Sequence, residues 1–207
     1  MILCLVTERR RFSDSGRGLL EQVRRAADAG VDLIQVRERD LEAAELVDLV
    51  GRIMNVTRGS PTRVVVNDRV DVALAADADG VHLRHDSIAV PAARELARAG
   101  WLIGRSVHNT EELDEAIGAD YVIAGTVFET GSKPSGVSLL GLEGLRAVAS
   151  ASPAPVLAIG GITLERMRDV AATGAAGMAG ISLFVLDGLK DVVADARRRF
   201  DSVKSAS

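Results

Sequence analysis

Five polar residues sit at the ends of two neighbouring apolar runs in this chain. Gln35, Arg37 and Arg39 alternate at the end of one run, and Asn67 and Asp68 end the next. Alternation places Gln35, Arg37 and Arg39 on the same side of an extended segment. Guanidinium and amide groups gathered at one point are suited to an anionic substrate, which they hold through charge-assisted hydrogen bonds. We therefore predict an anion site at these run ends.

Two carboxylates indicate a metal ion at the same place. Asp68 and Asp86 follow adjacent apolar runs, and Mg²⁺ favours one or two carboxylates together with phosphate oxygens. The histidines His82, His85 and His108 are a weaker candidate for zinc, because no cysteine or second acid completes a ligand set. Mg²⁺ held by Asp68 and Asp86 is therefore the expected cofactor.

A second group of residues is suited to holding a phosphate through the backbone. Gly160 and Gly161 follow the seventh apolar run, and Ile181 and Ser182 end the eighth. In many barrel enzymes, phosphate binds to backbone N–H groups after these two strands, and glycine allows the backbone to approach the anion closely.

The segment Glu129 to Gly136 is longer than an ordinary connection between a strand and a helix. Long loops in compact domains are often lids. Thr130, Ser132 and Lys133 offer two hydroxyls and one ammonium group that can close over an anion. A polar surface loop without a role in binding is the alternative.

Alternating elements must position these residues. Most of the eight apolar runs are continuously hydrophobic, which is typical of parallel strands covered on both faces. Longer amphipathic segments between the runs are expected to be helices. The expected strands are Ile2 to Thr7, Asp32 to Glu38, Arg63 to Asp68, Gly80 to Leu83, Leu102 to Val107, Tyr121 to Val127, Pro155 to Gly161 and Gly177 to Ser182. The expected helices are Arg17 to Ala29, Leu41 to Val56, Val70 to Ala76, Val90 to Ala99, Thr110 to Ile117, Gly141 to Ser150, Thr163 to Thr173 and Asp187 to Phe200.

Eight strand and helix pairs in 207 residues predict a closed parallel (β/α)8 barrel, with residues 1–207 as a single domain. An open doubly wound sheet is the alternative, but no Gly-x-Gly-x-x-Gly motif follows the first strand. Active sites of such barrels form at the carboxyl ends of the strands. Four consecutive ends carry Arg, Asn, Asp or Ser, including Arg105 and Ser106 on the fifth strand, so we expect one polar mouth there.

Composition narrows the range of partners. Lys and Arg total 25, Asp and Glu total 29, and aromatic residues make up 3% of the chain. Without a basic footprint or stacking rings, nucleic-acid binding is not expected. We expect no membrane partner, because the longest uncharged stretches contain prolines or are rich in glycine and alanine. A single cysteine, Cys4, fits a reducing cytoplasm. A homo-oligomer is left open.

Together these motifs resemble those of the thiamin phosphate synthase and TenI family, small (β/α)8 barrels of thiamin biosynthesis. The resemblance covers nearly the whole chain, from Gln35 to Arg39 through to Ile181 and Ser182. In the synthase, a pyrimidine methyl diphosphate loses pyrophosphate with the help of Mg²⁺. The ring nitrogen of a thiazole phosphate then captures the carbocation. Phosphorylated pyrimidine and thiazole molecules are therefore the expected partners.

The resemblance also implies residue roles. Asp68 binds the metal ion, and among the residues that hold the pyrimidine diphosphate we assign four as catalytic. Thr126 is a further substrate-binding candidate. The residues for the pyrimidine and its diphosphate are Gln35, Arg37, Arg39, Asn67, Ser106 and Lys133, of which Arg37, Arg39, Ser106 and Lys133 are the catalytic four; those for the thiazole phosphate are Thr130, Ser132, Gly161, Ile181 and Ser182.

Three departures from the family pattern leave alternatives open. Arg39 stands where the synthase usually has lysine, which keeps the charge and alters the geometry. Ser87 stands where a second metal-binding aspartate is expected, and Asp86 is one place early. Several other segments are closer to TenI, the thiazole tautomerase, yet Thr126 replaces its catalytic histidine.

Synthase chemistry is our first hypothesis. A tautomerase would need His82, His85 or His108 as its general base. A barrel that binds a thiamin precursor without turnover is the third hypothesis.

Overall fold

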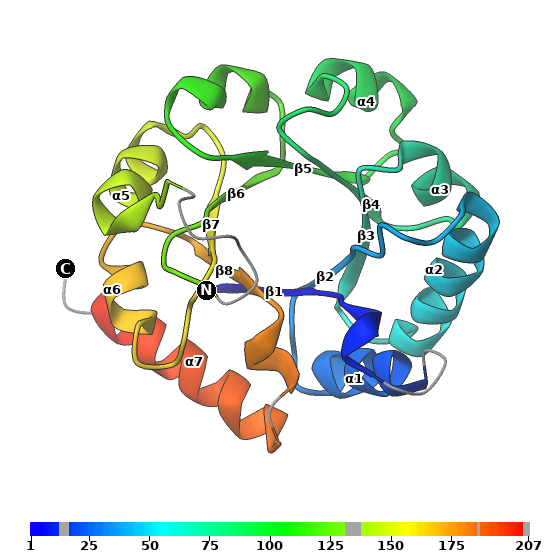
Figure 1. The fold of residues 1–207 in the computed structure, drawn as a ribbon, viewed down its shortest axis with the longest axis horizontal. Coiled ribbons are helices and arrows are strands. Elements are labelled where there is room, and N and C mark those ends of the chain that lie inside the picture. Colours follow the sequence, from blue (N-terminus) through cyan, green and yellow to red (C-terminus); the bar gives the residue numbers. More distant parts are fainter. Residues whose placement is uncertain (13–16, 131–137, 186, 205–207) are drawn as a thin grey trace.

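The computed structural model describes residues 1–12, 17–130, 138–185 and 187–204. Eight parallel strands follow one another around a closed barrel, and helices form the outer ring (Figure 1). The predicted (β/α)8 barrel is thus confirmed. The strands are β1 (Ile2–Val6), β2 (Leu33–Val36), β3 (Arg63–Asn67), β4 (Gly80–Leu83), β5 (Leu102–Val107), β6 (Tyr121–Gly125), β7 (Val156–Ile159) and β8 (Gly177–Gly180).

The outer elements are less uniform than the sequence pattern predicts. The 3₁₀ helices η1 (Arg9–Arg11) and η3 (Ser182–Val185) were not expected, and the predicted helix Thr110 to Ile117 is the 3₁₀ helix η2 (Glu111–Ala116). The outer elements are η1 (Arg9–Arg11), α1 (Arg17–Asp28), α2 (Ala43–Thr57), α3 (Val70–Ala75), α4 (Val90–Leu96), η2 (Glu111–Ala116), α5 (Gly141–Ala151), α6 (Met167–Ala171), η3 (Ser182–Val185) and α7 (Leu189–Lys204).

Several strands end before the expected boundary. The parallel ladder of β2 stops at Val36, which pairs with Val66 of β3. The next backbone N–H, that of Arg37, donates to the Thr7 side-chain oxygen at 2.9 Å instead of to a strand. Thus Arg37 to Arg39 lie on a loop above the barrel and not within β2.

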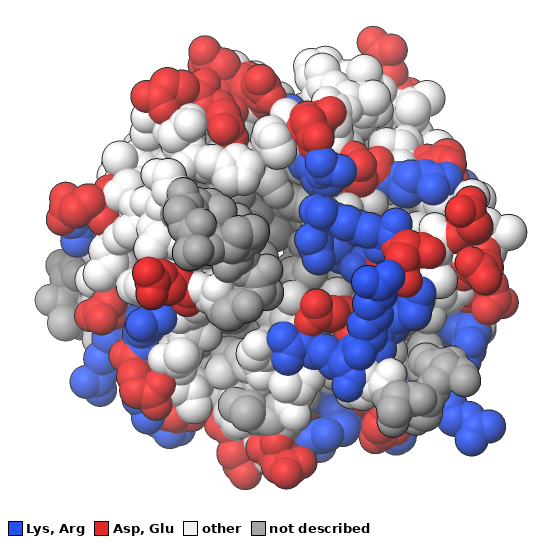
Figure 2. Space-filling model, viewed as in Figure 1, with Lys and Arg blue, Asp and Glu red and all other residues white. Residues whose placement is uncertain are grey.

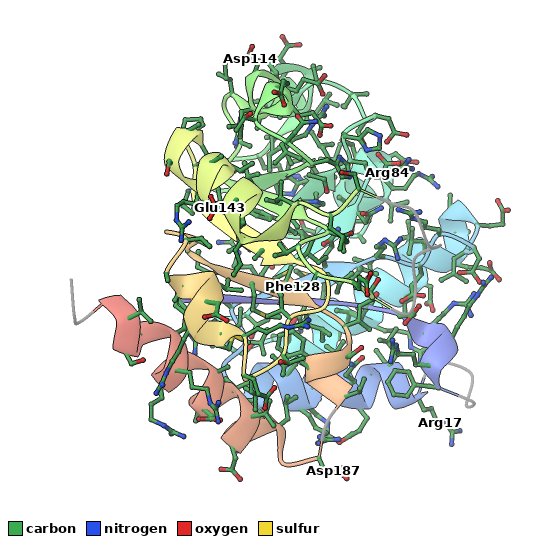
Figure 3. All side chains as sticks on the ribbon, turned by 60° about the vertical axis from the view of Figure 1, so that its left-hand side comes forward. Arg17, Arg84, Asp114, Phe128, Glu143 and Asp187 are labelled. Atoms are coloured by element: carbon green, nitrogen blue, oxygen red, sulfur yellow. The ribbon has the colours of Figure 1, made fainter. Side chains whose placement is uncertain are left out.

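Apolar side chains pack on both sides of the strands (Figure 3). Alternate residues of each strand point into the barrel or outward to the helices. The inner cluster includes Cys4, Leu33, Val65, Tyr121 and Leu157. Cys4 is fully buried there, as a small apolar side chain would be.

The barrel closes between the first strand and the last. Cys4 of β1 lies opposite Ala179 of β8, and α7 covers the seam from outside. Its residue Arg197 donates to the carbonyl oxygens of Met1 at 2.7 Å and Gly30 at 2.6 Å. Arg197 also forms an ion pair with Asp32 at 2.8 Å. In the described residues no helix has the length and apolar character needed to cross a membrane.

Candidate active site

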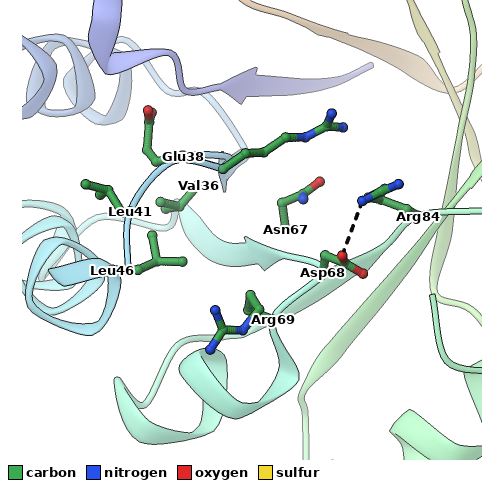
Figure 4. A pocket seen from close by; sticks show the side chains of 9 residues that line it. Val36, Glu38, Leu41, Leu46, Asn67, Asp68, Arg69 and Arg84 are labelled. Carbon is green, nitrogen blue, oxygen red and sulfur yellow. Dashed lines mark ion pairs between the residues drawn. The ribbon is translucent and has the colours of Figure 1, made fainter. Parts of the chain in front are cut away.

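A pocket of about 180 Å³ opens at the carboxyl ends of β2, β3 and β4. It is smaller than the roughly 300–1,000 Å³ typical of a complete ligand site. Asn67, Asp68 and Arg84 converge on one side of it (Figure 4). The lining residues are Val36, Glu38, Arg39, Leu41, Leu46, Asn67, Asp68, Arg69 and Arg84.

Arginines follow the ends of two strands, β2 and β4, beside this pocket. Burial lowers the pKa of Arg37, and the like charges of Arg39 and Arg84 lower it further. Arg39 and Arg84 both line the pocket, and Arg37 lies two residues before Arg39 on the loop after β2. Figure 2 shows basic side chains gathered right of the centre of this view, where Figure 1 labels β2 to β4. An anion placed among them would relieve the repulsion.

A buried chain of hydrogen bonds fixes the backbone at Arg37. The Glu38 carboxylate is 5% exposed and accepts from the Thr7 hydroxyl at 2.7 Å and from the backbone N–H of Arg9 at 3.0 Å. The Thr7 oxygen in turn accepts the Arg37 N–H. Burial raises the pKa of Glu38, while these donors oppose the shift. Glu38 therefore holds the loop in place and points away from the arginine cluster.

Gln35 orients Asn67. The Gln35 amide nitrogen donates to the Asn67 oxygen at 2.9 Å. Gln35 is 3% exposed, whereas Asn67 lines the pocket. Because the Asn67 oxygen faces Gln35, its NH₂ group remains to donate to a ligand.

Asp68 takes a backbone conformation that non-glycine residues rarely adopt, with φ of 68°. Such strain clusters at functional sites. The Asp68 carboxylate accepts a hydrogen bond from the Ser87 hydroxyl and lies 3.6 Å from Arg84 (Figure 4). Asp86 instead pairs with Arg84 at 2.5 Å and is half exposed. Ser87, and not Asp86, thus occupies the position beside Asp68.

This donor set fits Mg²⁺ in part. Asp68 and Ser87 place a carboxylate and a hydroxyl together, and Mg²⁺ commonly takes one or two carboxylates plus phosphate oxygens and water. Among the described residues there is no group of three or more His, Cys, Asp or Glu side chains that could hold a metal ion without a substrate. Asp86 as a ligand stays a prediction.

The barrel interior carries a row of three hydrogen-bonding side chains. His82 of β4 contacts the Ser106 hydroxyl of β5 through Nε2 at 2.8 Å and the Tyr121 hydroxyl of β6 through Nδ1 at 3.2 Å. Complete burial lowers the pKa of His82 to about 3, and the charge of Arg105 adds to the effect. Burial also raises the pKa of Tyr121. Both His82 and Tyr121 are therefore neutral near pH 7.

The ends of β6 to β8 are built differently. Thr126 is buried just after β6, and Gly160 and Gly161 follow β7 with φ of 102° and 63°. A Cβ atom on Gly161 would lie 2.8 Å from the Phe128 Cβ, so the tight turn has no room for a side chain. Arg166 holds this turn from outside, donating to the Gly161 carbonyl at 2.5 Å with its guanidinium 4.3 Å from the Phe128 ring centre.

The remaining predicted residues fall in three places. Ile181 lies just beyond β8, and Ser182 begins η3. Thr130 is the last described residue before the long loop, whereas Ser132 and Lys133 lie outside the described residues. The expectation that Glu129 to Gly136 forms a lid also falls largely on residues outside them.

One expected mouth residue, Arg105, points the other way. It alternates with Ser106 on β5, so its side chain enters the layer between the strands and the helices, where it is 3% exposed. There it donates to the carbonyl oxygens of His85 and Ile88 and pairs with Glu115. Arg105 therefore ties down the loop after β4, which carries Arg84 and Ser87.

The three histidines do not gather at one point. The rings of His85 and His108 meet edge to face with centres 4.9 Å apart, and His108 contacts Glu112 at 3.0 Å. His82 lies inside the barrel with Tyr121. The structure therefore gives the zinc alternative no support among the described residues.

Sequence reasoning missed Thr7, Arg84 and Tyr121. Thr7 and Arg84 adjoin strand ends, so their position was the available signal. No local signal marks Tyr121, because its contact with His82 depends on the register of three strands.

The fold and the site define a class: a parallel (β/α)8 barrel with an arginine-rich anion site at the carboxyl ends of its strands. The family model described as thiamine monophosphate synthase matches residues 3–184. The chain belongs to this family.

Relatives and a solved structure agree with that assignment. The chain is 44% identical over 149 residues to a thiamine-phosphate synthase of Moorella thermoacetica, covering 71% of each chain. It is 41% identical over 169 residues to one of Chlorobium luteolum, covering 79% of this chain and 76% of that protein. A solved thiamine phosphate pyrophosphorylase from Pyrococcus furiosus superposes with a TM-score of 0.82 at 36% identity, covering 98% of this chain and 96% of that one.

Proposed function

We propose that this protein joins a hydroxymethylpyrimidine diphosphate to a thiazole phosphate, giving thiamin phosphate and pyrophosphate. The observation that carries the proposal is the cluster of Arg37, Arg39 and Arg84 above Asn67 and Asp68. The relatives named thiamine-phosphate synthase support the same reaction. The chain as a whole has a net charge of −4, so this group of arginines contrasts with the charge of the rest of the protein.

The reaction breaks the C–O bond between the pyrimidine methylene and the diphosphate, and the electron pair leaves with the diphosphate oxygen. Negative charge therefore grows on the leaving group in the transition state. Preorganised guanidinium groups stabilise such charge without reorganising, which is the role we assign to Arg37, Arg39 and Arg84. The thiazole nitrogen then donates its lone pair to the methylene carbon and forms the new C–N bond.

Asp68 is the residue we assign to Mg²⁺, together with Ser87 or Asp86. When bound with the diphosphate, the ion would supply further positive charge to the leaving group. Asn67 would donate through its oriented NH₂ group, and Ser106 would meet the pyrimidine at the top of the barrel. Lys133 remains a further candidate from the sequence.

The thiazole phosphate is assigned to the ends of β6 to β8. Gly161 has no side chain of its own, so its backbone N–H can be approached closely by an anion. Ile181, Ser182, Thr126, Thr130 and Ser132 are the further candidates there. Separate anchors at the two sides of the mouth would leave the methylene carbon and the thiazole nitrogen facing each other over its centre.

The described contacts of His82 do not favour the tautomerase. Both His82 ring nitrogens are engaged inside the barrel, and its pKa of about 3 makes it a weak base. Thr126 cannot replace the missing histidine as a base. We also propose a cytoplasmic location, which the single buried free thiol of Cys4 supports.

The direct test mixes purified protein with both phosphorylated substrates and Mg²⁺ and measures thiamin phosphate and pyrophosphate. We expect both products in equal amounts, and none without the thiazole phosphate. A parallel reaction follows interconversion of thiazole isomers. Isomerisation without thiamin phosphate would establish the tautomerase instead, and tight binding without either turnover would establish a binding protein.

A further inference from the structure

Three neighbouring strands bring Ser106, His82 and Tyr121 together inside the barrel. His82 of β4 lies opposite Gly104 of β5 in the ladder, and Gly104 lies opposite Tyr121 of β6. His82, Gly104 and Tyr121 therefore lie in the same interior layer. A Cβ atom on Gly104 would overlap the Tyr121 ring and His82, so glycine is what lets the two rings meet across β5. Ser106, two residues further along β5, also points inward but one layer closer to the mouth.

The positions of the hydrogen atoms on Tyr121 and His82 can be derived by counting hydrogen-bond donors and acceptors. Tyr121 is 5% exposed, and within the described residues its hydroxyl has one hydrogen-bond partner, Nδ1 of His82. If Nδ1 carried the hydrogen, the phenol hydrogen would be buried without an acceptor, which is costly. The phenol therefore donates to Nδ1. His82 is neutral, so its one ring hydrogen must be on Nε2.

The same count decides what Ser106 can do. Nε2–H of His82 donates to the Ser106 oxygen at 2.8 Å. Ser106 then accepts on its barrel side and keeps its own hydrogen. Its side chain is partly exposed, whereas His82 below it is 1% exposed. The Ser106 hydroxyl hydrogen can therefore point toward the mouth of the barrel.

We propose that Tyr121 is a positioning residue that fixes His82 as the Nε2–H tautomer and thereby makes Ser106 a hydrogen-bond donor toward the substrate. The group that meets Ser106 is then an acceptor, either a ring nitrogen with a free lone pair or an anionic oxygen. A substrate group that can only donate is rejected at this point, because two donors would face each other. The substrate part rests on the proposed function, whereas the tautomer does not.

The first experiment measures the tautomer itself by NMR on the full-length protein labelled with ¹⁵N at histidine. We expect the His82 signals to show a protonated Nε2 and an unprotonated Nδ1. A protonated Nδ1 in the wild-type protein would overturn the proposal, whether or not the protein makes thiamin phosphate. Substitution of His82 identifies its signals among those of the three histidines.

The second experiment compares Tyr121→Phe, Ser106→Ala and the double variant. The phenylalanine variant removes one hydroxyl and keeps the ring. It should no longer favour protonation of Nε2, and its kcat/KM for the pyrimidine diphosphate should fall about tenfold, as for the loss of one hydrogen bond. In the Ser106→Ala background, Tyr121→Phe should change kcat/KM by less than about twofold, because Tyr121 affects the substrate only through the Ser106 hydroxyl.

A matched control removes a buried hydroxyl far from the mouth. Thr173→Val deletes a side-chain donor that is 2.7 Å from the Val170 carbonyl and should leave both the His82 signals and kcat unchanged. Additive losses in the double variant, or an unchanged His82 tautomer in Tyr121→Phe, would show that Tyr121 only fills space. If the wild-type protein makes no thiamin phosphate, the proposed function fails, and the NMR experiment still decides the tautomer.

Discussion

The two sides of the barrel mouth are built from different groups. We call the ends of β2 to β5, with Arg37, Arg39, Asp68, Arg84 and Ser106, the side-chain half. The ends of β6 to β8, with Gly160, Gly161, Ile181 and Ser182, are the backbone half. In the side-chain half, the like charges of Arg39 and Arg84 lower the pKa of Arg37, and Arg84 also pairs with Asp86. In the backbone half, the nearby cation Arg166 is already engaged with the Gly161 carbonyl and the Phe128 ring. Arg84 and Phe128, which belong to the two sides, are labelled in Figure 3.

The difference teaches how one mouth can distinguish two phosphorylated substrates. A leaving diphosphate gains charge during the reaction and needs strong cations. A phosphate that only anchors its substrate needs shape and N–H donors. Variants in the side-chain half should therefore change the rate of C–O cleavage, and variants in the backbone half should change the affinity for the thiazole phosphate.

Removal of Arg37 should have the largest effect. Arg37→Ala deletes the half-buried member of the arginine cluster and should lower kcat about 10²-fold to 10³-fold, as for loss of one preorganised donor. Steady-state kinetics with both substrates measure it, and the KM for thiazole phosphate should stay unchanged. Arg10→Ala is the control, since its side chain is 72% exposed, pairs with Asp40 and does not line the pocket. A fall of less than threefold in Arg37→Ala would remove the cluster from the mechanism.

His82 should make the protein sensitive to acid. Its pKa is about 3 in the folded protein and 6.5 without the fold, so below pH 6.5 the unfolded chain takes up a proton that the folded chain refuses. The free energy of unfolding should fall by roughly 1.4 kcal/mol for each pH unit between 6.5 and 3 from this residue alone. Urea denaturation of the wild type and His82→Gln measures the difference. Equal pH slopes in the two proteins would contradict the assignment.

Gly161→Ala tests the backbone half. The new Cβ would press on Phe128 and displace the turn, so the KM for thiazole phosphate should rise about tenfold while the KM for the diphosphate stays constant. Gly100→Ala is a matched control: Gly100 has φ of 76° with no atom within 4 Å of the added Cβ. Both variants should lose about 1 kcal/mol of stability from their φ angles. An equal rise in both KM values would mean that the two halves are not separate.

Arg39→Lys should have the smallest effect. Arg39 lies at the exposed edge of the pocket, and lysine keeps the charge while losing the planar fork of donors. We expect kcat/KM to change by no more than about threefold. A loss comparable to that of Arg37→Ala would show that Arg39 binds the diphosphate in a two-pronged geometry.

The fold was readable from the sequence because parallel strands covered on both faces leave continuous apolar runs, such as Val64 to Val66. The ends of the strands and helices at the barrel mouth could not be predicted from the sequence. The expected strand Asp32 to Glu38 ends at Val36, since Thr7 takes over the next backbone hydrogen bond. The expected helix Thr110 to Ile117 is only six residues of 3₁₀ helix, a length at which α-helical hydrogen bonding gives little stability.

Site residues could be predicted from the sequence where polar side chains directly follow a strand. Gln35, Asn67 and Asp68 were found in this way, and they meet in the structure. Arg105 was misplaced because proximity to a strand end does not give direction, although alternation with Ser106 contains that information. Ser87 beside Asp68 depends on how the loop after β4 folds back, which no local pattern records.

The pairing of β1 with β8 affects how the chain can fold during its synthesis on the ribosome. The edge of β1 finds its second neighbour only after more than 170 further residues have been made, and Arg197 arrives later still. Until then, the first strand presents unsatisfied backbone groups to any other nascent chain nearby. Slow synthesis of the residues from Gly177 onward should therefore favour aggregation, whereas rapid completion should protect the new chain.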